Sequence, residues 1–504
     1  MQADPTAQTR EKMPRLKRDR HHSDPHYGPP FLNGKEIWKS VNAAHFLRQK
    51  LDSSPARDVF LRWQSADACE HKTSHAVIQR ISSMSTKCLF ALLALCTATA
   101  SHAATWFVAP TGDDAAAGSI DHPFATIQRA QKDAAPGDTV FLRGGTYRMT
   151  EPQIAQRKRI FAYVTVLDKS GAPGKPITYR NYEDEKPVFD CSLLKPEGMR
   201  VDAVFITGSW LHLRGFEVTG VQVTVLGHTQ SICFESNGSH NVFERLSMHD
   251  GQAIGIYHVR GSENLFLNCD AWNNWDHTSE DGKGGNVDGF GCHPTKGSTG
   301  NIFRGCRAWF NSDDGYDCIG AQESVTFENC WALYNGLSPK FEKLGDGNGF
   351  KAGGYGTLAA DRLPAPIPRH TIRFCVAVGN RASGFYANHH PGGSDWSNNT
   401  AYRNGTNFNM LGRLADNRTD VDGYGHKLRN NLSYKSRSDI SRFDAAKCDL
   451  AGNSFARDPK LTDKDFVNLD ESELVRPRQA NGDLPVVDCL HPAGGSTLVG
   501  AFRR

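Results

Sequence analysis

The sequence predicts an all-β fold, a solenoid of the parallel β-helix type, because two patterns repeat through its central region. In the first pattern, Cys or Asn is followed by Ala two residues later and by Asn three residues after that. The first residues of the five copies are Cys269, Cys306, Cys330, Cys375 and Asn399, and the closing residues are Asn274, Asn311, Asn335, Asn380 and Asn404. Self-similarity at a period of roughly 20–50 residues is typical of proteins built from stacked repeats.

The spacing and composition of these copies favour strands over helices. Successive closing Asn residues lie 37, 24, 45 and 24 residues apart, so the unit is about 24 residues long and two units carry longer loops. The units are rich in β-branched and aromatic residues and are separated by Asn and Gly, which argues against helical repeats. We therefore expect each unit to supply short strands to one coil of a stacked β-helix.

The second pattern predicts what fills the interior of the coils. It places Asp, Asn or Ser before Gly and an aromatic residue, at Asp288-Gly289-Phe290, Asp314-Gly315-Tyr316, Asn348-Gly349-Phe350 and Ser383-Gly384-Phe385. We expect the aromatic rings to stack inside the coils and the closing Asn residues to bond the backbone at the turns. The cysteines suit small buried packing positions, and disulfide pairing in an exported chain stays open as the alternative.

The two ends of the repeat region differ from its middle. The stretch from Thr105 to Arg148 predicts a strand, a loop, an amphipathic helix over residues 123–135 and a second strand. An N-terminal capping helix of this kind would cover the open end of a solenoid, which otherwise exposes core and strand edges. We expect the β-helix domain over residues 104–450 and an irregular C-terminal tail over residues 451–504 that packs on it.

The N-terminal part of the chain predicts export. Residues 84–103 combine Lys87, an apolar stretch from Cys88 to Cys96 and a run of small residues, which is the layout of a secretory signal peptide. We interpret residues 1–83 as a non-native extension upstream of a true start at Met84, with a genuine disordered extension as the alternative. The expected location is therefore secreted, either extracellular or periplasmic.

The charge distribution narrows the classes of partner. The chain has 504 residues and a formal net charge of +3, but residues 1–83 carry 14 Lys and Arg against 9 Asp and Glu. From residue 104 onward, 43 basic residues face 46 acidic ones, so a nucleic-acid partner loses its electrostatic support. No apolar run reaches the roughly 18 residues that a spanning helix needs, so we expect no membrane partner. We also expect a monomeric protein.

Acidic residues concentrate in two neighbouring units of the repeat. These residues are Asp288, Asp313, Asp314 and Asp317. If the aromatic residue of the second pattern points inward, the next residue points outward, which puts Lys351 beside Asp317 one coil along. Carboxylates on adjacent coils repel one another unless a cation joins them, and oxygen ligands without thiols suit Ca²⁺. The alternative is a solvated acidic turn with Lys351 in a surface salt bridge.

Five motifs closely resemble the family 9 polysaccharide lyases, which are pectate-lyase-like, calcium-dependent enzymes. The motifs are NVDGFG (286–291), GCRAWFNSDDGYD (305–317), ENCWALYNG (328–336), GNGFKAGG (347–354) and CVAVGNRASGF (375–385). The resemblance covers residues 105–440 and implies a right-handed parallel β-helix as the catalytic domain. It also implies one Brønsted base, Lys351, and four calcium ligands, Asp288, Asp313, Asp314 and Asp317.

The activity implied by this resemblance is β-elimination on an acidic polysaccharide, with pectate or polygalacturonate as the first expectation. Bound Ca²⁺ would acidify the C5 proton of a uronic acid, and neutral Lys351 would remove that proton. A lysine base predicts an alkaline optimum, and dependence on Ca²⁺ predicts inactivation by chelators. Tyr386, His389 and His390 depart from the Asp- and Asn-rich pattern of typical pectate lyases. Rhamnogalacturonan or another uronate polymer therefore stays open. We interpret the two His residues as a surface pair, with a contact to sugar as the alternative.

Two other functions stay open from the sequence. A polygalacturonase-type glycoside hydrolase also combines a β-helix with paired Asp residues, but this chain lacks convincing versions of the further His and Arg-Lys motifs. A non-catalytic carbohydrate-binding or adhesion β-helix would not need Lys351 beside an acidic cluster. Formation of an unsaturated sugar product separates a lyase from both alternatives.

Overall fold

The computed structural model describes residues 103–457, 460–494 and 498–502. The interpretations of residues 1–83 as an extension and of residues 84–103 as a signal peptide concern a stretch of which only Ala103 is described. Export therefore stays a prediction. Within the described ranges, no helix combines the length and the apolar character that a membrane span requires.

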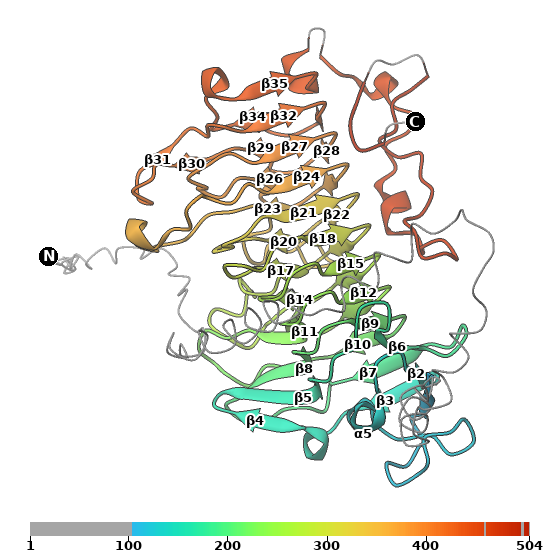
Figure 1. Cartoon of the computed structure of the whole chain (residues 1–504). Coiled ribbons are helices and arrows are strands. Elements are labelled where there is room, and N and C mark those ends of the chain that lie inside the picture. Colours follow the sequence, from blue (N-terminus) through green and yellow to red (C-terminus); the bar gives the residue numbers. More distant parts are fainter. Residues whose placement is uncertain (1–102, 458–459, 495–497, 503–504) are drawn as a thin grey trace, which may run out of the picture. The chain divides into compact units, whose positions relative to one another are not determined.

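Most of the regular structure in the described residues belongs to three sheets, named A, B and C here (Figure 1). Sheet A consists of β1 (Thr105–Val108), β2 (Thr139–Leu142), β6 (Ile177–Asn181), β9 (Leu211–Arg214), β12 (Val242–Glu244), β15 (Leu265–Leu267), β18 (Asn301–Arg304), β21 (Val325–Glu328), β24 (Thr371–Arg373), β27 (Asp395–Ser397), β32 (Lys427–Arg429) and β35 (Asp449–Ala451). Sheet B consists of β3 (Gly145–Arg148), β7 (Pro187–Asp190), β10 (Glu217–Thr219), β13 (Ser247–His249), β16 (Asp270–Trp272), β19 (Arg307–Trp309), β22 (Trp331–Leu333), β25 (Val376–Val378), β28 (Thr400–Tyr402) and β33 (Leu432–Tyr434). Sheet C consists of β4 (Gln156–Lys158), β5 (Phe161–Leu167), β8 (Arg200–Ile206), β11 (Ser231–Ser236), β14 (Ala253–His258), β17 (Phe290–Cys292), β20 (Tyr316–Asp317), β23 (Phe350–Lys351), β26 (Ser383–Tyr386), β29 (Thr406–Asn409) and β34 (Ile440–Ser441).

The chain visits the three sheets in turn, once per coil. The strands β15, β16 and β17 form one coil, and β18, β19 and β20 form the next, with parallel pairing between the two coils in every sheet. Parallel neighbours lie about 4.8 Å apart, so a residue type that recurs in each coil forms a ladder along the stack. This topology confirms the predicted all-β solenoid.

An aromatic ladder fills the interior behind sheet C. The ring centroids lie 5.0 Å apart for Phe290 and Tyr316, 4.6 Å for Tyr316 and Phe350, and 5.1 Å for Phe350 and Phe385, with interplanar angles of 8°, 2° and 10°. All four rings are fully buried. Because each ring points inward, the residue that follows it on the strand faces outward. The predicted ladder is confirmed, and it fixes which side chains of sheet C reach solvent.

A ladder of buried Asn residues holds the corner between sheets B and C. The side-chain amide of each Asn donates to the side-chain oxygen of the next, over 3.0 Å from Asn274 to Asn311, 3.2 Å from Asn311 to Asn335 and 3.0 Å from Asn335 to Asn380. The same amide also donates to a backbone carbonyl, for example from Asn335 to Ala308 over 3.0 Å. Every rung therefore satisfies buried polar groups of its own and of the adjacent coil, as the sequence predicts.

The cysteines behave as small buried packing residues. The ten cysteines of the described ranges are free, and all of them except the half-buried Cys448 are buried. Within the ladder, the Cys306 thiol donates to the backbone carbonyl of Phe266 over 3.3 Å. Where the repeat replaces Cys by Asn, the amide of Asn399 donates to the side-chain oxygen of Asn431 over 3.0 Å. One position thus serves two residue types that both donate across the stack.

The N-terminal capping helix is present but shorter than predicted. The helix α5 spans Ile127–Asp133 instead of residues 123–135, and it lies against β1, β2 and β5. It begins late because the side chain of Thr126 caps it by accepting from the backbone N–H of Arg129 over 3.0 Å. The carboxylate of Asp114 holds the backbone of Thr126 outside the helix over 2.9 Å.

The C-terminal tail contacts the outer face of sheet B, where it follows the stack (Figure 1). Short 3₁₀ turns are its regular elements, η4 (Ser454–Ala456), η5 (Asp463–Asp465) and η6 (Glu471–Val475). Other 3₁₀ turns are η1 (Glu151–Gln153), η2 (Ala360–Arg362) and η3 (Ala445–Lys447), and β30 (Gly412–Arg413) pairs with β31 (Asp420–Val421). Phe466, Leu474 and Leu490 of the tail share an apolar cluster with Trp331 and Val376 of the sheet.

A buried charge network anchors the same tail. The Asp270 carboxylate of β16 pairs with Arg307 of β19 over 2.7 Å and with Arg478 of the tail over 2.6 Å. Arg307 also donates to the backbone carbonyl of Arg476 over 2.8 Å. Burial opposes the charge of Asp270, but the two guanidinium groups outweigh it and hold the pKa of Asp270 below its usual value. The buried carboxylate is therefore compensated by two guanidinium groups.

Removal of one Asn rung tests the ladder. Asn335→Ala leaves buried partners in two adjacent coils without hydrogen bonds, so we expect the free energy of unfolding to fall by about 1–3 kcal/mol or more. Denaturant unfolding followed by circular dichroism measures the change. Asn481→Ala, at an exposed tail position, is the control and should stay within about 0.5 kcal/mol of the parent. Equal stability of both variants would contradict a structural role for the ladder.

Buried neutral histidines predict loss of stability in acid. Burial lowers the pKa to about 3 for His258, His370 and His426 and to about 4 for His390. An unfolded histidine has a pKa of about 6.5. Burial of the neutral imidazoles therefore does not reduce the unfolding free energy above that pH, and the unfolding free energy falls as the pH drops toward the folded pKa. His258→Phe should reduce the pH slope of the unfolding free energy by about 1.4 kcal/mol per pH unit between pH ~6 and ~4. An unchanged slope in urea unfolding across that window would contradict a neutral His258.

Candidate active site

A ladder of side-chain acceptors positions the acidic residues where each coil enters sheet C. Asp288 Oδ1 accepts the backbone N–H of Asp314 over 3.2 Å, and Asp314 Oδ1 accepts the backbone N–H of Asn348 over 2.6 Å and its amide over 2.9 Å. Asn348 then accepts the backbone N–H of Ser383 over 3.2 Å. These four residues occupy the equivalent positions that the second sequence pattern predicts. The ladder leaves Asp314 Oδ2 free to face other groups.

Lys351 belongs to the row of sheet C residues that follow the aromatic rings and face outward, and it contacts this ladder at Asp314. The register pairs Gly291 with Asp317, Asp317 with Lys351 and Lys351 with Tyr386. The Lys351 ammonium lies 3.0 Å from Asp317 Oδ2 and 3.0 Å from Asp314 Oδ2, and its side chain is 11% exposed. The contact with Asp317 follows from the predicted register. The equal contact with Asp314 does not, because Asp314 lies before the aromatic residue and reaches Lys351 through its second oxygen.

The acidic residues gather into two overlapping triads. Asp288, Asp314 and Asp317 offer carboxylate oxygens within 4.8 Å of one another. Asp313, Asp314 and Asp346 form a second such group. The structure thus brings the four predicted acidic residues together, with Asp314 in both triads, and it adds Asp346, which the sequence analysis missed. Asp346 lies in the same GDGNGFK segment as Lys351, and this position is the signal that could have identified it.

The electrostatics of the cluster are unfavourable for an isolated set of carboxylates. Burial, followed by the charge of Asp317, raises the pKa of Asp288 well above its usual value, and burial and Asp314 do the same for Asp313. Burial raises the pKa of Asp314 to about 6, although Lys351 pulls it down. Burial opposes the charge of Lys351, but the neighbouring carboxylates outweigh it and raise its pKa. One lysine therefore does not neutralise the cluster.

The donor set of the first triad fits a hard divalent cation. Its three residues are buried, and no thiol or imidazole belongs to either triad. Asp314 Oδ2 is buried and accepts no hydrogen bond, so the ion pair with Lys351 is its sole compensation among the described residues. Oxygen-rich sites of this kind suit Ca²⁺. A cation here would relieve both the repulsion and the uncompensated oxygen.

The two histidines singled out as sugar contacts lie in different environments. His390 is buried, accepts the backbone N–H of Gly354 over 3.3 Å and contacts the carbonyl of Pro368 over 2.9 Å. Because His390 is buried, both the surface position and the sugar contact are wrong for this residue. His389 is half-buried and pairs with Asp420 over 2.8 Å at the β30–β31 hairpin. His389 keeps one edge near the outward row, because its ring centroid lies 6.1 Å from that of Tyr386.

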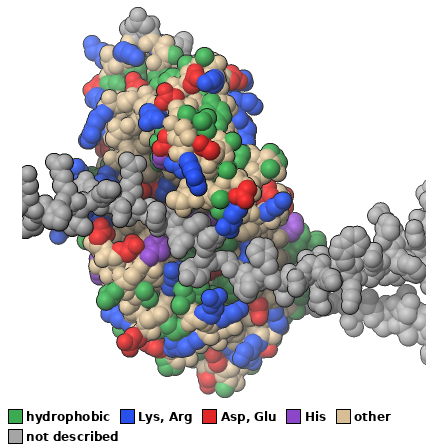
Figure 2. Space-filling model, turned by 90° about the vertical axis from the view of Figure 1, so that its left-hand side faces the viewer, with side chains coloured by type: hydrophobic (Ala, Val, Ile, Leu, Met, Phe, Trp, Pro, Cys, Tyr) green, Lys and Arg blue, Asp and Glu red, His purple; other side chains and the backbone are tan. Residues whose placement is uncertain are grey.

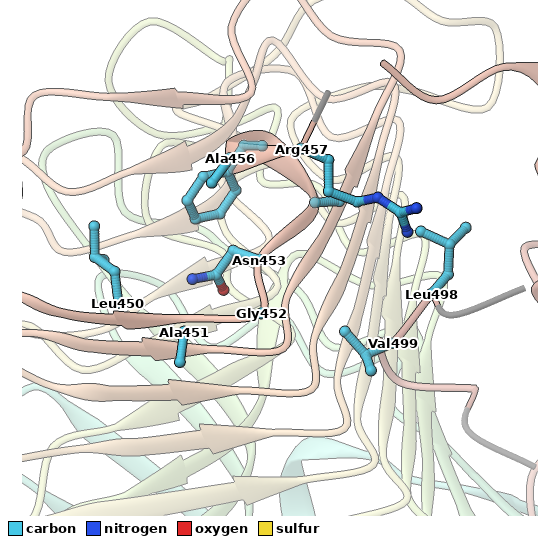
Figure 3. Close-up of a pocket in the computed structure, with 10 residues that line it drawn as sticks. Leu450, Ala451, Gly452, Asn453, Ala456, Arg457, Leu498 and Val499 are labelled. Atoms are coloured by element: carbon cyan, nitrogen blue, oxygen red, sulfur yellow. The ribbon is translucent and has the colours of Figure 1, made fainter. Parts of the chain in front are cut away.

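Neither cavity shape nor surface charge locates the site by itself. An open cavity of about 460 Å³ lies at the last coil (Figure 3), but its lining is mostly apolar, contains no carboxylate and includes Leu450, Phe455, Arg457 and Leu498. On the visible part of the face in Figure 2, acidic and basic side chains are interspersed. The buried acidic cluster with Lys351 is the chemically distinctive feature.

Comparison with known proteins agrees with this geometry. The family model described as "Pel9A-like, right handed beta helix region" matches residues 106–431. Pectate lyase L of Dickeya chrysanthemi is 32% identical over 410 residues, which cover 79% of this chain and 86% of the relative. Pectate lyase PEL9 of Emericella nidulans is 31% identical and covers 79% of this chain and 94% of its own.

Two solved structures share the architecture. A rhamnogalacturonan lyase is 45% identical with a TM-score of 0.75, over 77% of this chain and 96% of that chain. The crystal structure of pectate lyase Pel9A is 30% identical with a TM-score of 0.65, over 80% of this chain and 97% of that chain. The right-handed coil expected from the motifs is thereby confirmed. The chain belongs to polysaccharide lyase family 9 and is a polysaccharide lyase on a right-handed parallel β-helix.

Proposed function

We propose that this lyase is calcium-dependent and cleaves a galacturonate-containing polymer by β-elimination, with Lys351 as the base. The observation that carries the proposal is the position of Lys351, which lies on an outward row, 3.0 Å from each of two buried carboxylates. Two carboxylates contact Lys351 directly and three more lie in the same cluster, so one lysine offsets only part of their charge. The arrangement is what a base next to a cation site requires.

The proposed cation ligands are Asp288, Asp314 and Asp317, with Asp313 at the edge of the same site. When bound, Ca²⁺ would offset the charge of these carboxylates and polarise the carboxylate of a bound uronic acid, which makes its C5 proton more acidic. The Asp residues enter this state already positioned. Asp288 and Asp314 are fixed by the backbone N–H groups of the following coils, and Asp317 accepts from Ile319 over 2.7 Å.

The same carboxylates set the protonation state of Lys351. While they are uncompensated, their charge raises the pKa of Lys351 and keeps it protonated. Once their charge is offset, burial becomes the dominant influence and favours the neutral amine. Lys351 is therefore a competent base in the loaded enzyme, and its activity should increase toward alkaline pH.

The proton and electron movements follow from this placement. Lys351 Nζ takes the proton from C5 of the uronic acid, and the electron pair of that C–H bond forms the C4–C5 double bond. The C4–O4 bond breaks, and the leaving oxygen takes a proton from water. The product is a 4,5-unsaturated sugar. No water adds across the glycosidic bond, which distinguishes this reaction from hydrolysis.

Two polymers are candidates for the substrate. The sequence motifs favour polygalacturonate, and the pectate lyase relatives at 31–32% identity support it. The rhamnogalacturonan lyase structure, however, is 45% identical over 96% of its length. We therefore place rhamnogalacturonan first and polygalacturonate second. Their backbones differ in one respect that a binding site can sense, since rhamnogalacturonan alternates the uronic acid with a neutral deoxy sugar.

Replacement of Lys351 tests the base. Lys351→Ala should lower kcat by about 10²–10⁴-fold, because proton removal loses its acceptor. Ultraviolet absorbance of the unsaturated product measures the rate on both polymers with calcium present. Lys427→Ala, an outlying sheet A lysine whose side chain is 52% exposed, should retain the parent rate. Full activity of Lys351→Ala would refute its role, and new reducing ends without absorbance would indicate a hydrolase.

Calcium binding has a readout that does not depend on activity. At a calcium concentration of about 100 times its Kd, the parent should gain about 2.7 kcal/mol of unfolding free energy. Asp288→Asn should lose most of this gain while being more stable than the parent without calcium, since a buried repulsive charge is removed. Calcium and chelator titrations of the melting temperature check both effects. Asp184→Asn at an exposed position is the control, and an undiminished calcium response in Asp288→Asn would contradict the assignment.

A further inference from the structure

A small polar pocket lies at the corner between sheets B and C, in the coil of Asp288 and the two coils before it. Its volume is about 190 Å³, and its lining includes Gln222, Asp250, Gln252, Asn273, Trp275 and His277. This is smaller than the roughly 300–1,000 Å³ of pockets for drug-sized ligands. The pocket therefore suits one unit of a polymer rather than a large molecule.

The walls of the pocket are held by hydrogen bonds to the solenoid. Trp275 follows the ladder residue Asn274, and its backbone N–H donates to Gly251 over 2.8 Å. The indole N–H of Trp275 donates to the carbonyl of Gly282 over 2.9 Å, which fixes the ring. Gln252 is only 5% exposed, and its side-chain oxygen accepts from the Thr278 hydroxyl over 2.7 Å. This hydrogen bond fixes the Gln252 side chain in the lining.

The pocket borders the acidic cluster through one glycine segment. A Cβ on Gly284 would lie 3.0 Å from Trp275 Cδ1 and 2.3 Å from Ser312 Oγ, so the segment runs between the two side chains. A Cβ on Gly345 would lie 3.0 Å from Gly285 Cα and 2.9 Å from Asp313 Oδ1. Gly284 and Gly285 thus separate the pocket from the acidic cluster. The pocket thus lies next to the coils that carry the acidic cluster.

The chemistry of the lining selects a neutral sugar over a uronic acid. The lining contains no Lys or Arg, and its one carboxylate, Asp250, is paired with His249 over 2.7 Å and Asn273 over 2.5 Å. A uronate carboxylate would meet this charge with only the imidazole of His277 in the lining to offset it. Amide side chains match sugar hydroxyls, and an indole ring packs against the apolar face of a sugar or a deoxy-sugar methyl group.

We propose that this pocket is a subsite for the neutral sugar next to the uronic acid that is cleaved. The proposal rests on the proposed lyase function and deepens it, because it selects a polymer that alternates uronic acid with a neutral sugar. Homogalacturonan would place a carboxylate against Asp250. Rhamnogalacturonan would place rhamnose there, with its methyl group available to Trp275.

Kinetics on the two polymers test the subsite. Trp275→Ala should raise KM on rhamnogalacturonan by about two- to tenfold, with kcat changed less, because a stacking contact is lost. Trp275→Phe should retain part of the contact. Gln222→Leu keeps the loop intact and should raise KM in the same direction. On polygalacturonate, all three should stay near the parent KM. Trp210→Asn, which removes a partly exposed Trp that stacks on His240, is the control.

A binding measurement separates this proposal from the lyase function. Tryptophan fluorescence of the Lys351→Ala protein is titrated with rhamnose and with galacturonate, and the calcium-dependent shift in melting temperature is measured on each variant. Preferential binding of rhamnose that Trp275→Ala abolishes, with an unchanged calcium shift, supports the subsite even if no polymer is cleaved. Equal responses to both sugars, or unchanged rhamnose binding in Trp275→Ala, would overturn it. Absence of lyase activity with intact rhamnose preference would refute the proposed function alone.

Discussion

The register between stacked coils is the constraint on which the rest of this molecule depends. Parallel pairing places equivalent residues of successive coils about 4.8 Å apart, so each repeated residue type has to be compatible with a copy of itself. Aromatic rings and Asn side chains meet this condition well, because rings stack and amides both donate and accept. The rings of Tyr316 and Phe350, 4.6 Å apart, and the buried chain from Asn274 to Asn404 show the result.

The same register makes repeated charged residues unfavourable for stability, and the acidic cluster is a place where this occurs. Asp288 and Asp314 occupy one ladder position on adjacent coils, where like charges repel and burial favours the neutral acid. Residues further along the ladder, Asn348 and Ser383, are neutral, so the unfavourable charge is confined to two coils. Such local conflict with stability is typical of functional sites. Lys351 offsets only part of the repulsion among the carboxylates, and we propose that a bound cation offsets the rest.

Much of this organisation follows from the sequence, and the exceptions have identifiable physical causes. The ladders, the inward aromatic rings and the Lys351–Asp317 contact depend on strand alternation alone, so counting positions was sufficient. The contact between Lys351 and Asp314, the participation of Asp346 and the pocket at Trp275 depend on how loops fold over the corner between sheets B and C. Loop geometry carries no periodic signal. The start of α5 at Ile127 likewise depends on capping by Thr126 and on Asp114. The Asp114 carboxylate accepts the backbone N–H groups of Ala125 and Thr126, which lie 11 and 12 residues later in the chain.

The central claim is that the carboxylates bind calcium and that Lys351 acts as the base. The calcium affinity of Lys351→Met tests this claim most directly. The substitution removes the positive charge that competes with calcium for Asp314 and Asp317, and it keeps the carboxylates and the bulk of the side chain. Calorimetric titration with calcium measures the affinity of this variant. The account predicts calcium binding at least as tight as in the parent protein, in a variant that has lost its base. Weaker binding, or none, would show that Lys351 is a structural partner of the carboxylates, and it would contradict the account.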